Sequence, residues 1–375
     1  VWEYIYWRLP VGKRQFLDKA NDLVKKADSL RQILESGIKN SYNHQNELYN
    51  QMSGKIDGLS NEVRHLHEEN ARLERIITHY HKQDMQMFWE EYRKDGESTA
   101  DAQKRFFLAL PKAKGVSRNL QLLEKDLLRA FARICEENQL SYWLYAGTLL
   151  GAVRHKGFIP WDDDIDISMP RADYEKLIAS FPKNGRYKIL DHRTSKDYFN
   201  NFVKVIDTNT KIVDNRNDKT YESGLFIDIF PMDRFDDMKA VDKTYNLESF
   251  KLLSFSKHCN IVYGDSVIKD MIRSVCWFFL KPVSPTFFAK KIDKASAKYT
   301  KDNGKYIGLL ASKFKEKEVL DFDPFKEIID MPFEGVTLKG PKEYDKLLRQ
   351  YYGDYMQLPP VEKQVNPHEL DAYMK

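Results

Sequence analysis

The first hundred residues carry apolar side chains at alternating steps of three and four positions. From Tyr49 the steps fill successive positions of a heptad repeat, with Asn70 as the clearly polar member: Met52, Ile56, Leu59, Val63, Leu66, Leu73, Ile77 and Tyr80. A 3.5-residue period held this long predicts a coiled coil over residues 16–95. A polar amide at such a position commonly selects an in-register pair, so we expect a homodimer through this segment.

The earlier part of this repeat is one residue out of phase. Apolar residues from Phe16 to Leu34 keep the step, and Gly37 follows them, so we expect a register break or bend there. A continuous helix over 16–92 would be about 115 Å long. The alternative is a long amphipathic helix folded against the chain's own globular domain, but the apolar stripe is narrow for that role.

Three further segments complete the expected organisation. Residues 1–15 are aromatic and basic, and they suit either a membrane-interface cluster or the aromatic cap of a helix. Because the first residue is Val1, we expect that the natural chain could continue upstream. Residues 96–116 are charged and end at a Pro/Gly break, which predicts a linker. Residues 117–375 would form one globular domain, with a mainly helical insert at 233–323.

Composition narrows the class of protein. The chain has 60 basic and 56 acidic residues and a net charge of +4, without the dense basic face of a duplex-binding protein, so we expect no nucleic-acid partner. The three cysteines are far apart and form no Cys-x-x-Cys pair. They therefore predict neither a disulfide framework nor a zinc site, which fits a reducing compartment such as the cytoplasm.

A strand, a glycine turn and a helix follow one another after residue 139. The apolar run 140–146 predicts a short buried strand, and Gly147 and Thr148 interrupt it before a second helix that reaches Arg154. This order presents backbone N–H groups to a phosphate at a helix N-terminus. An ordinary turn at the end of a strand is the alternative.

An acidic stretch follows the turn that ends at Trp161. If residues 162–168 are extended, Asp162, Asp164 and Asp166 share one face while Asp163 points the other way. Carboxylates spaced about 7 Å apart repel one another unless a cation lies among them, and oxygen ligands suit Mg²⁺ or Mn²⁺. An acidic turn is the alternative, and the spacing does not fit a calcium loop.

Two later strands supply further charged side chains. Asp228 lies within the apolar run 224–231, where a buried carboxylate needs a partner. A position beside the strand of Asp164 and Asp166 would supply that partner through bound metal. Lys204, within the predicted strand 201–207, would face the same site or else remain a surface lysine.

Together these motifs resemble the nucleotidyltransferase fold and, more narrowly, the LicD family, which is related to fukutin-type proteins. The resemblance rests on 145–154, on 157–167, on the Phe-Ile-Asp-Ile-Phe-Pro strand at 226–231 and on the tail between Phe333 and Pro360. It covers residues 120–368 but not the coiled coil. The implied fold class is α+β, a nucleotidyltransferase-like mixed sheet with flanking helices, preceded by the long N-terminal coiled coil.

The resemblance implies transfer of an alcohol phosphate from a CDP-linked donor, with CMP as the leaving group. The alcohol would be choline, ribitol or glycerol, and the acceptor a hydroxyl of a cell-surface glycan such as teichoic acid, or of its lipid-linked precursor. The enzyme would then work at the inner face of the bacterial plasma membrane. The implied roles are catalysis by Asp164, Asp166 and Asp228, metal binding by these three with Asp162, and substrate binding by Gly147, Thr148, Arg154, Trp161 and Lys204.

The insert adds a possible contact with lipid. Aromatics at 277–279 and 287–288 with nearby lysines suit a helix resting on an anionic membrane surface, although they also suit an ordinary core. Two other functions use the same residues differently. One is transfer of a nucleoside monophosphate from an NTP, and the other is a coiled-coil scaffold whose transferase domain is inactive.

Overall fold

The computed structural model describes residues 11–37, 42–195, 198–213, 224–255, 267–312, 314–365 and 371–374. Contacts between Cα atoms divide the chain into two compact units. The first contains the N-terminal helices up to residue 92 with two short later segments, and the second contains the rest. The aromatic residues predicted to form a cluster at the N-terminus lie outside the described residues.

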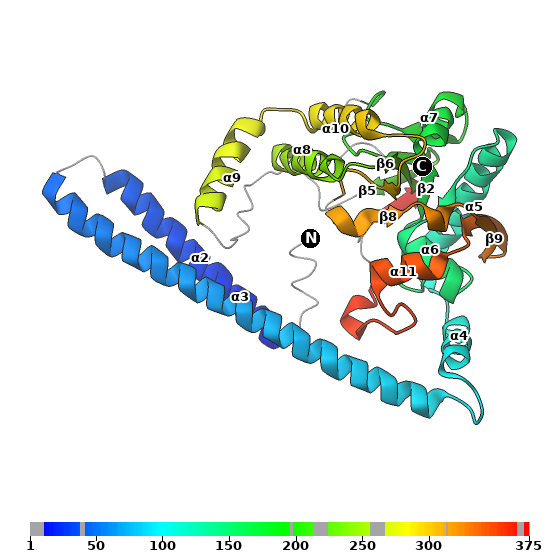
Figure 1. The fold of residues 1–375 in the computed structure, drawn as a ribbon, viewed down its shortest axis with the longest axis horizontal. Coiled ribbons are helices and arrows are strands. Elements are labelled where there is room, and N and C mark those ends of the chain that lie inside the picture. The colour runs from blue at the N-terminus through cyan, green and yellow to red at the C-terminus, as the bar shows by residue number, and fades with distance from the viewer. Residues whose placement is uncertain are drawn as a thin grey trace. The chain divides into compact units, whose positions relative to one another are not determined.

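The N-terminal unit is built on two helices that pack along each other (Figure 1). Helix α2 spans Val11–Gly37 and helix α3 spans Tyr42–Tyr92, with Leu23 and Met52 buried. The end of α2 at Gly37 fits the predicted break, but the single rod of about 115 Å is wrong, because α2 packs against α3 within one chain. A coiled-coil dimer stays a prediction.

The second unit is organised by a mixed seven-stranded sheet. Its main order is β1-β2-β6-β4-β3, and β7 and β8 continue it from the far end of β6. The pair β2–β6 is parallel and the other pairs are antiparallel. The strands are β1 Trp143–Leu144, β2 Asp166–Pro170, β3 Tyr187–Leu190, β4 Val203–Asp207, β6 Phe226–Phe235, β7 Tyr306–Gly308 and β8 Val319–Asp321. This agrees with the predicted mixed sheet.

The helices after residue 92 belong to this unit, apart from residues 267–274, and two small antiparallel pairs complete it. The helices are α4 Thr99–Ala109, α5 Gly115–Glu137, α6 Ala146–Arg154, α7 Arg171–Ser180, α8 Lys239–Phe255, α9 Val267–Leu280, α10 Pro285–Tyr299 and α11 Tyr344–Tyr352. The small pairs are β9 Ile328–Phe333 with β10 Val336–Pro341, and β5 Thr210–Val213 with β11 Asp371–Met374. Three 3-10 turns are Lys315–Glu318, Asp323–Phe325 and Val361–Lys363.

Two of the predicted segments can be compared with these elements. The insert at 233–323 is mainly helical, since it holds α8, α9 and α10, and α8 and α10 lie side by side (Figure 1). The expected linker at 96–116 contains helix α4, whose Phe107 is buried. Within the described ranges, no helix combines the length and the apolar character needed to cross a bilayer.

The hydrophobic core explains why the acidic side chains lie where they do. Ile167 on β2 and Ile227 and Ile229 on β6 are fully buried in the main core. Because side chains alternate along a strand, their neighbours Asp166 and Asp228 project from the opposite face of the sheet. The apolar stripe of α5, which includes Leu127 and Phe131, packs into the same core.

Candidate active site

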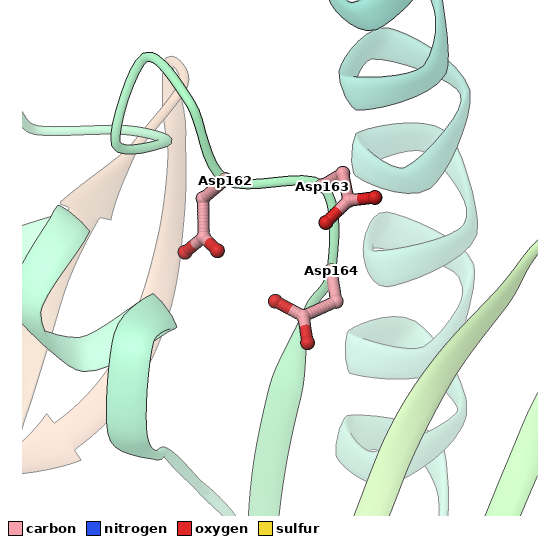
Figure 2. Close-up of side chains that lie close together, drawn as sticks. All are labelled: Asp162, Asp163 and Asp164. Atoms are coloured by element: carbon pink, nitrogen blue, oxygen red, sulfur yellow. The ribbon is translucent and has the colours of Figure 1, made fainter. Parts of the chain in front are cut away.

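Three consecutive aspartates gather in the loop that leads into β2 (Figure 2). Each of Asp162, Asp163 and Asp164 offers a carboxylate oxygen, and these oxygens lie within 4.8 Å of one another. The prediction that the strand starts at Asp162 is wrong, because β2 begins only at Asp166. Without the pleat of a strand, the side chains before Asp166 need not alternate, and Asp163 therefore joins the cluster instead of pointing away.

Two neighbouring strands add the remaining charged groups. Asp166 on β2 lies directly opposite Asp228 on the parallel strand β6, and Lys204 on β4 lies opposite Asp228 from the other side. The Nζ of Lys204 is 2.6 Å from Oδ1 of Asp228 and 3.2 Å from the centre of the Phe226 ring. The structure thus places Asp166, Asp228 and the buried Lys204 side by side, as the sequence predicts.

The electrostatics of this cluster fit a divalent cation. Burial, the charge of Asp164 and a hydrogen bond with that residue raise the pKa of Asp162 well above its ordinary value. Burial and the charges of Asp164 and Asp228 also raise the pKa of Asp166, which Lys204 opposes. Carboxylates this close repel one another in the ionised state, and a hard divalent cation relieves that repulsion. Oxygen donors in this number suit Mg²⁺ or Mn²⁺.

The start of helix α6 lies against these aspartates. Thr148 is 3% exposed, and its hydroxyl accepts a 2.8 Å hydrogen bond from the backbone N–H of Asp166. A Cβ on Gly147 would lie 2.9 Å from Oδ2 of Asp162, so a residue without a side chain lets that carboxylate approach the helix. Both residues therefore shape the acidic site. Their binding of donor phosphate stays a prediction.

Arg154 and Trp161 lie further into the fold than a substrate-binding role suggests. Arg154 is 4% exposed, and its Nη1 donates to the carbonyl oxygens of Tyr355 and Gln357 at 2.8 and 3.4 Å. Burial lowers the pKa of Arg154 to about 10. Trp161 is partly buried against the main core. The guanidinium of Arg154 thus holds the segment after α11, and substrate contact by either residue stays a prediction.

Two residues near the cluster were not predicted from the sequence. Glu124 on α5 is 2% exposed, and burial followed by the charges of Asp164 and the other aspartates raises its pKa well above the ordinary value. For Tyr352 on α11, desolvation and the charges of Asp166 and Asp162 raise the pKa of the phenol, although 44% of the residue is exposed. The signal for Glu124 was a carboxylate within the apolar stripe of α5.

A glutamate from the β9–β10 turn fixes the start of the acidic loop, the segment 157–165 that carries the three consecutive aspartates and leads into β2. Glu334 and Gly335 have φ values of 51° and 78° and connect the two strands as a two-residue turn. The side chain of Glu334 is 4% exposed and accepts hydrogen bonds from Arg118 at 2.6 Å and Lys112 at 2.8 Å. Its backbone N–H donates to the carbonyl of Lys156, just before the loop.

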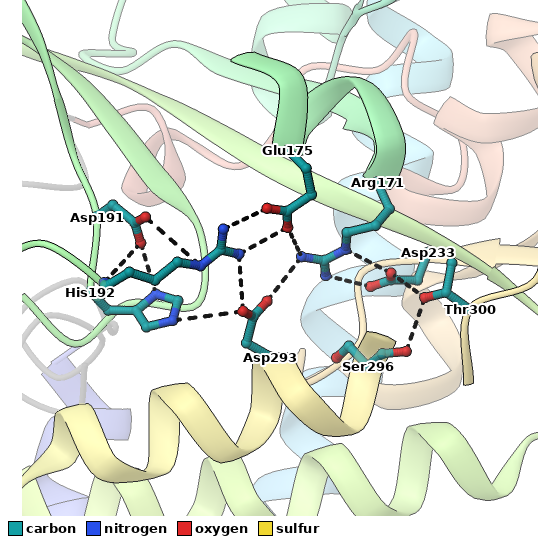
Figure 3. A network of polar contacts seen from close by, with 9 residues as sticks. Arg171, Glu175, Asp191, His192, Asp233, Asp293, Ser296 and Thr300 are labelled. Carbon is teal, nitrogen blue, oxygen red and sulfur yellow. Dashed lines mark hydrogen bonds and ion pairs between the residues drawn. The ribbon is translucent and has the colours of Figure 1, made fainter. Parts of the chain in front are cut away.

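A separate polar network joins α7, β6 and α10 (Figure 3). Arg171 donates two hydrogen bonds, of 2.8 and 2.7 Å, to the fully buried carboxylate of Asp233, and a third to Asp293 at 3.1 Å. Asp233 lies five residues after Asp228 on the same strand, a separation of about 17 Å. The network therefore stabilises the scaffold away from the acidic cluster.

Comparison with known proteins finds a matching family and several similar sequences. Residues 139–260 match the family described as "LicD/FKTN/FKRP, nucleotidyltransferase domain". Over 267 residues the chain is 31% identical to the lipopolysaccharide cholinephosphotransferase LicD of Haemophilus influenzae, which covers 68% of this chain and 97% of that protein. It is also 31% identical over 142 residues to an uncharacterized protein of Rickettsia prowazekii, covering 38% of this chain and 49% of the relative.

Proposed function

Because this chain belongs to the LicD family, we propose that it transfers phosphocholine, or a related alcohol phosphate, from a CDP-linked donor to a hydroxyl of a cell-surface glycan. The named relative acts on lipopolysaccharide, which supports a glycan acceptor or its lipid-linked precursor. The observation that carries the proposal is the convergence of the acidic loop with Asp166, Asp228 and Lys204, which lie side by side on the inner strands β2, β6 and β4.

The proposed reaction exchanges one ester of a phosphate for another. The acceptor oxygen forms a bond to the phosphorus that carries choline, and the bond from this phosphorus to the oxygen shared with CMP breaks, so that CMP leaves. Bound Mg²⁺ would neutralise charge on the donor phosphates. Asp162, Asp164, Asp166 and Asp228 would hold the cations.

The side chains of the site have distinct parts in this scheme. Asp228 would complete the metal site or accept the proton of the acceptor hydroxyl, and its contact with Lys204 fixes its position. Lys204 would offset the negative charge that develops as CMP departs. Gly147 and Thr148, at the N-terminus of α6, would orient the donor phosphates with backbone N–H groups.

The direct test is incubation of the purified chain with CDP-choline, Mg²⁺ and a lipopolysaccharide acceptor, followed by measurement of CMP and of choline on the glycan. We expect both products, and we expect Asp166→Ala to abolish them while circular dichroism stays unchanged. Full turnover by the folded variant would refute the assignment. CDP-ribitol in parallel tests the identity of the alcohol.

The same assay separates the two alternative functions. Release of pyrophosphate from CTP, without CMP from a CDP-linked donor, would indicate a nucleotidyltransferase. The absence of both products under all these conditions would favour a scaffold. The intact acidic cluster disfavours a scaffold without activity, since repelling carboxylates lower stability unless they bind a cation.

A membrane contact would bring the enzyme to a lipid-linked acceptor. On α9, Phe278 and Phe279 are 69% and 68% exposed, and Nζ of Lys281 lies 4.6 Å from the centre of the Trp277 ring. Exposed aromatics beside lysines suit the surface of an anionic bilayer. Flotation with vesicles of anionic lipid should weaken when Phe278 and Phe279 are replaced by Ser. Equal flotation of the folded variant would remove this part of the proposal.

Self-association through α3 is the remaining part of the proposal. Leu73, Ile77 and Tyr80 are 36%, 41% and 61% exposed, so the apolar stripe of α3 is not fully covered. A second copy of α3 would cover it. Light scattering should give a dimer for the full chain and a smaller mass after replacement of Leu73 and Ile77 by Gln. A monomeric mass for the unaltered chain would contradict this.

A further inference from the structure

Helix α5 brings one more carboxylate to the acidic loop. Glu124 belongs to the buried stripe of α5 between Leu120 and Leu127. One turn earlier, Nε2 of Gln121 donates to the backbone carbonyl of Asp162 at 2.9 Å. The face of α5 that carries Gln121 and Glu124 therefore lies against the loop. Figure 2 shows a helix running past the three aspartates, with Asp163 nearest to it.

The position of Glu124 is costly for a carboxylate that binds nothing. Only 2% of the residue is exposed, and Oε2 has no hydrogen-bond partner within the described part of the chain. A buried carboxylate without a partner lowers stability by several kcal/mol, or else it stays protonated. After burial itself, the like charges of Asp164, Asp163, Asp162 and Asp228 raise the pKa of Glu124 further. These aspartates add to the cost of burying a charged Glu124.

We propose that Glu124 is a further ligand of the divalent-cation site, supplied by the face of α5 that lies against the acidic loop. The inference deepens the proposed function because it assumes the same cation site. Counting charges supports it. Asp162, Asp163 and Asp164 have oxygens within 4.8 Å of one another, and Glu124, Asp166 and Asp228 are near enough to act on these charges, so that six carboxylates face the one positive charge of Lys204. About two divalent cations, the number typical of phosphoryl-transfer sites, would bring the sum close to neutrality.

The test is Mn²⁺ binding by the full chain, measured by titration calorimetry and by electron paramagnetic resonance. We expect Glu124→Gln to raise the Kd for Mn²⁺ at least tenfold or to remove one bound ion, as loss of a ligand or its close support does. The control is Glu136→Gln, an exposed glutamate on the same helix, which should bind Mn²⁺ like the unaltered chain. Unchanged affinity and stoichiometry in Glu124→Gln would overturn the proposal.

Thermal unfolding separates a ligand from a residue that only stabilises the fold. Without metal, Glu124→Gln should unfold at the same or a higher temperature, since a neutral amide replaces a buried acid. Saturating Mn²⁺ should then raise its Tm less than that of the unaltered chain. An equal Mn²⁺-induced rise would refute the proposal. If Glu124→Gln does not fold, Glu124→Asp keeps the charge but shortens the side chain, and unchanged Mn²⁺ binding there would be equally decisive.

The two proposals can fail separately. Mn²⁺ binding that depends on Glu124, together with no CMP from any CDP-linked donor, would end the transferase proposal and leave the ligand assignment standing. Normal CMP release with Mn²⁺ binding that is indifferent to Glu124→Gln would do the reverse.

Discussion

Replacing Gly157 with alanine should disturb the acidic loop from its first residue. A Cβ at Gly157 would overlap Oε1 of Glu334 and lie 2.9 Å from its Cδ. Glu334 has little room to move, because it is bound to Arg118 and Lys112 and its side chain is 4% exposed. Overpacking typically costs about 1–3 kcal/mol and breaking a buried ion pair about 3–5 kcal/mol. Since Lys112 is 61% exposed, its bond to Glu334 adds little to stability. We therefore expect Gly157→Ala to lower the free energy of unfolding by about 3 kcal/mol.

A double-mutant cycle in urea tests this cause. Gly157→Ala alone should lower the free energy of unfolding by about 3 kcal/mol, whereas in a Glu334→Ala background the same change should cost about 1 kcal/mol or less. The control is Gly58→Ala on α3, where a Cβ meets nothing within 4 Å and helix propensity should add up to about 1 kcal/mol of stability. Equal costs of Gly157→Ala in both backgrounds would refute the proposed clash.

Three further changes test other parts of the scaffold. Thr148→Val should lower the free energy of unfolding by about 1–3 kcal/mol, because the N–H of Asp166 loses its acceptor. Thr148→Ser keeps the hydroxyl and should not lower it, so equal urea midpoints for the two variants would contradict this reasoning. Burial lowers the pKa of His155 to about 3, so its neutral form stabilises the fold above about pH 6.5, and this contribution is lost as the pH falls below that value. The stability advantage over His155→Asn should therefore shrink by up to about 1.4 kcal/mol per pH unit in urea titrations, and a constant difference would be evidence against it. Asp233→Asn should lower the free energy of unfolding by about 3–5 kcal/mol, because it breaks the buried ion pair with Arg171, yet Mn²⁺ binding should stay unchanged. An unchanged Tm would contradict the expected loss of stability.

The strands of the site were predictable because local rules decide them. Asp166 and Asp228 each lie among isoleucines, and alternation along a strand places both on the face opposite the core. Their parallel pairing then brings them together. The loop before β2 was not predictable in the same way. Its course depends on Gln121, which binds the carbonyl of Asp162 from a helix far away in the sequence.

The surroundings of Glu124 and the packing of the N-terminal helices could not be predicted from the sequence for a different reason. A charged residue in an apolar stripe shows that something unusual is buried, but only the fold shows which groups surround it. The heptad step likewise fits a helix that pairs with another copy and one that pairs within its own chain. The pattern therefore predicted packing for α2 and α3 and the end near Gly37, but not that the two helices would pack on each other.

The anchors of the acidic loop act on its backbone. Gln121 binds the carbonyl of Asp162, Thr148 binds the N–H of Asp166, and the N–H of Glu334 binds the carbonyl of Lys156. Bonds of this kind fix the path of the chain without using the carboxylate oxygens that a cation would need. A scaffold that holds repelling side chains in place through their backbone keeps its geometry whether or not the charge is neutralised. Substitutions at Gln121 and Thr148 should therefore change cation affinity even though neither side chain would be a ligand.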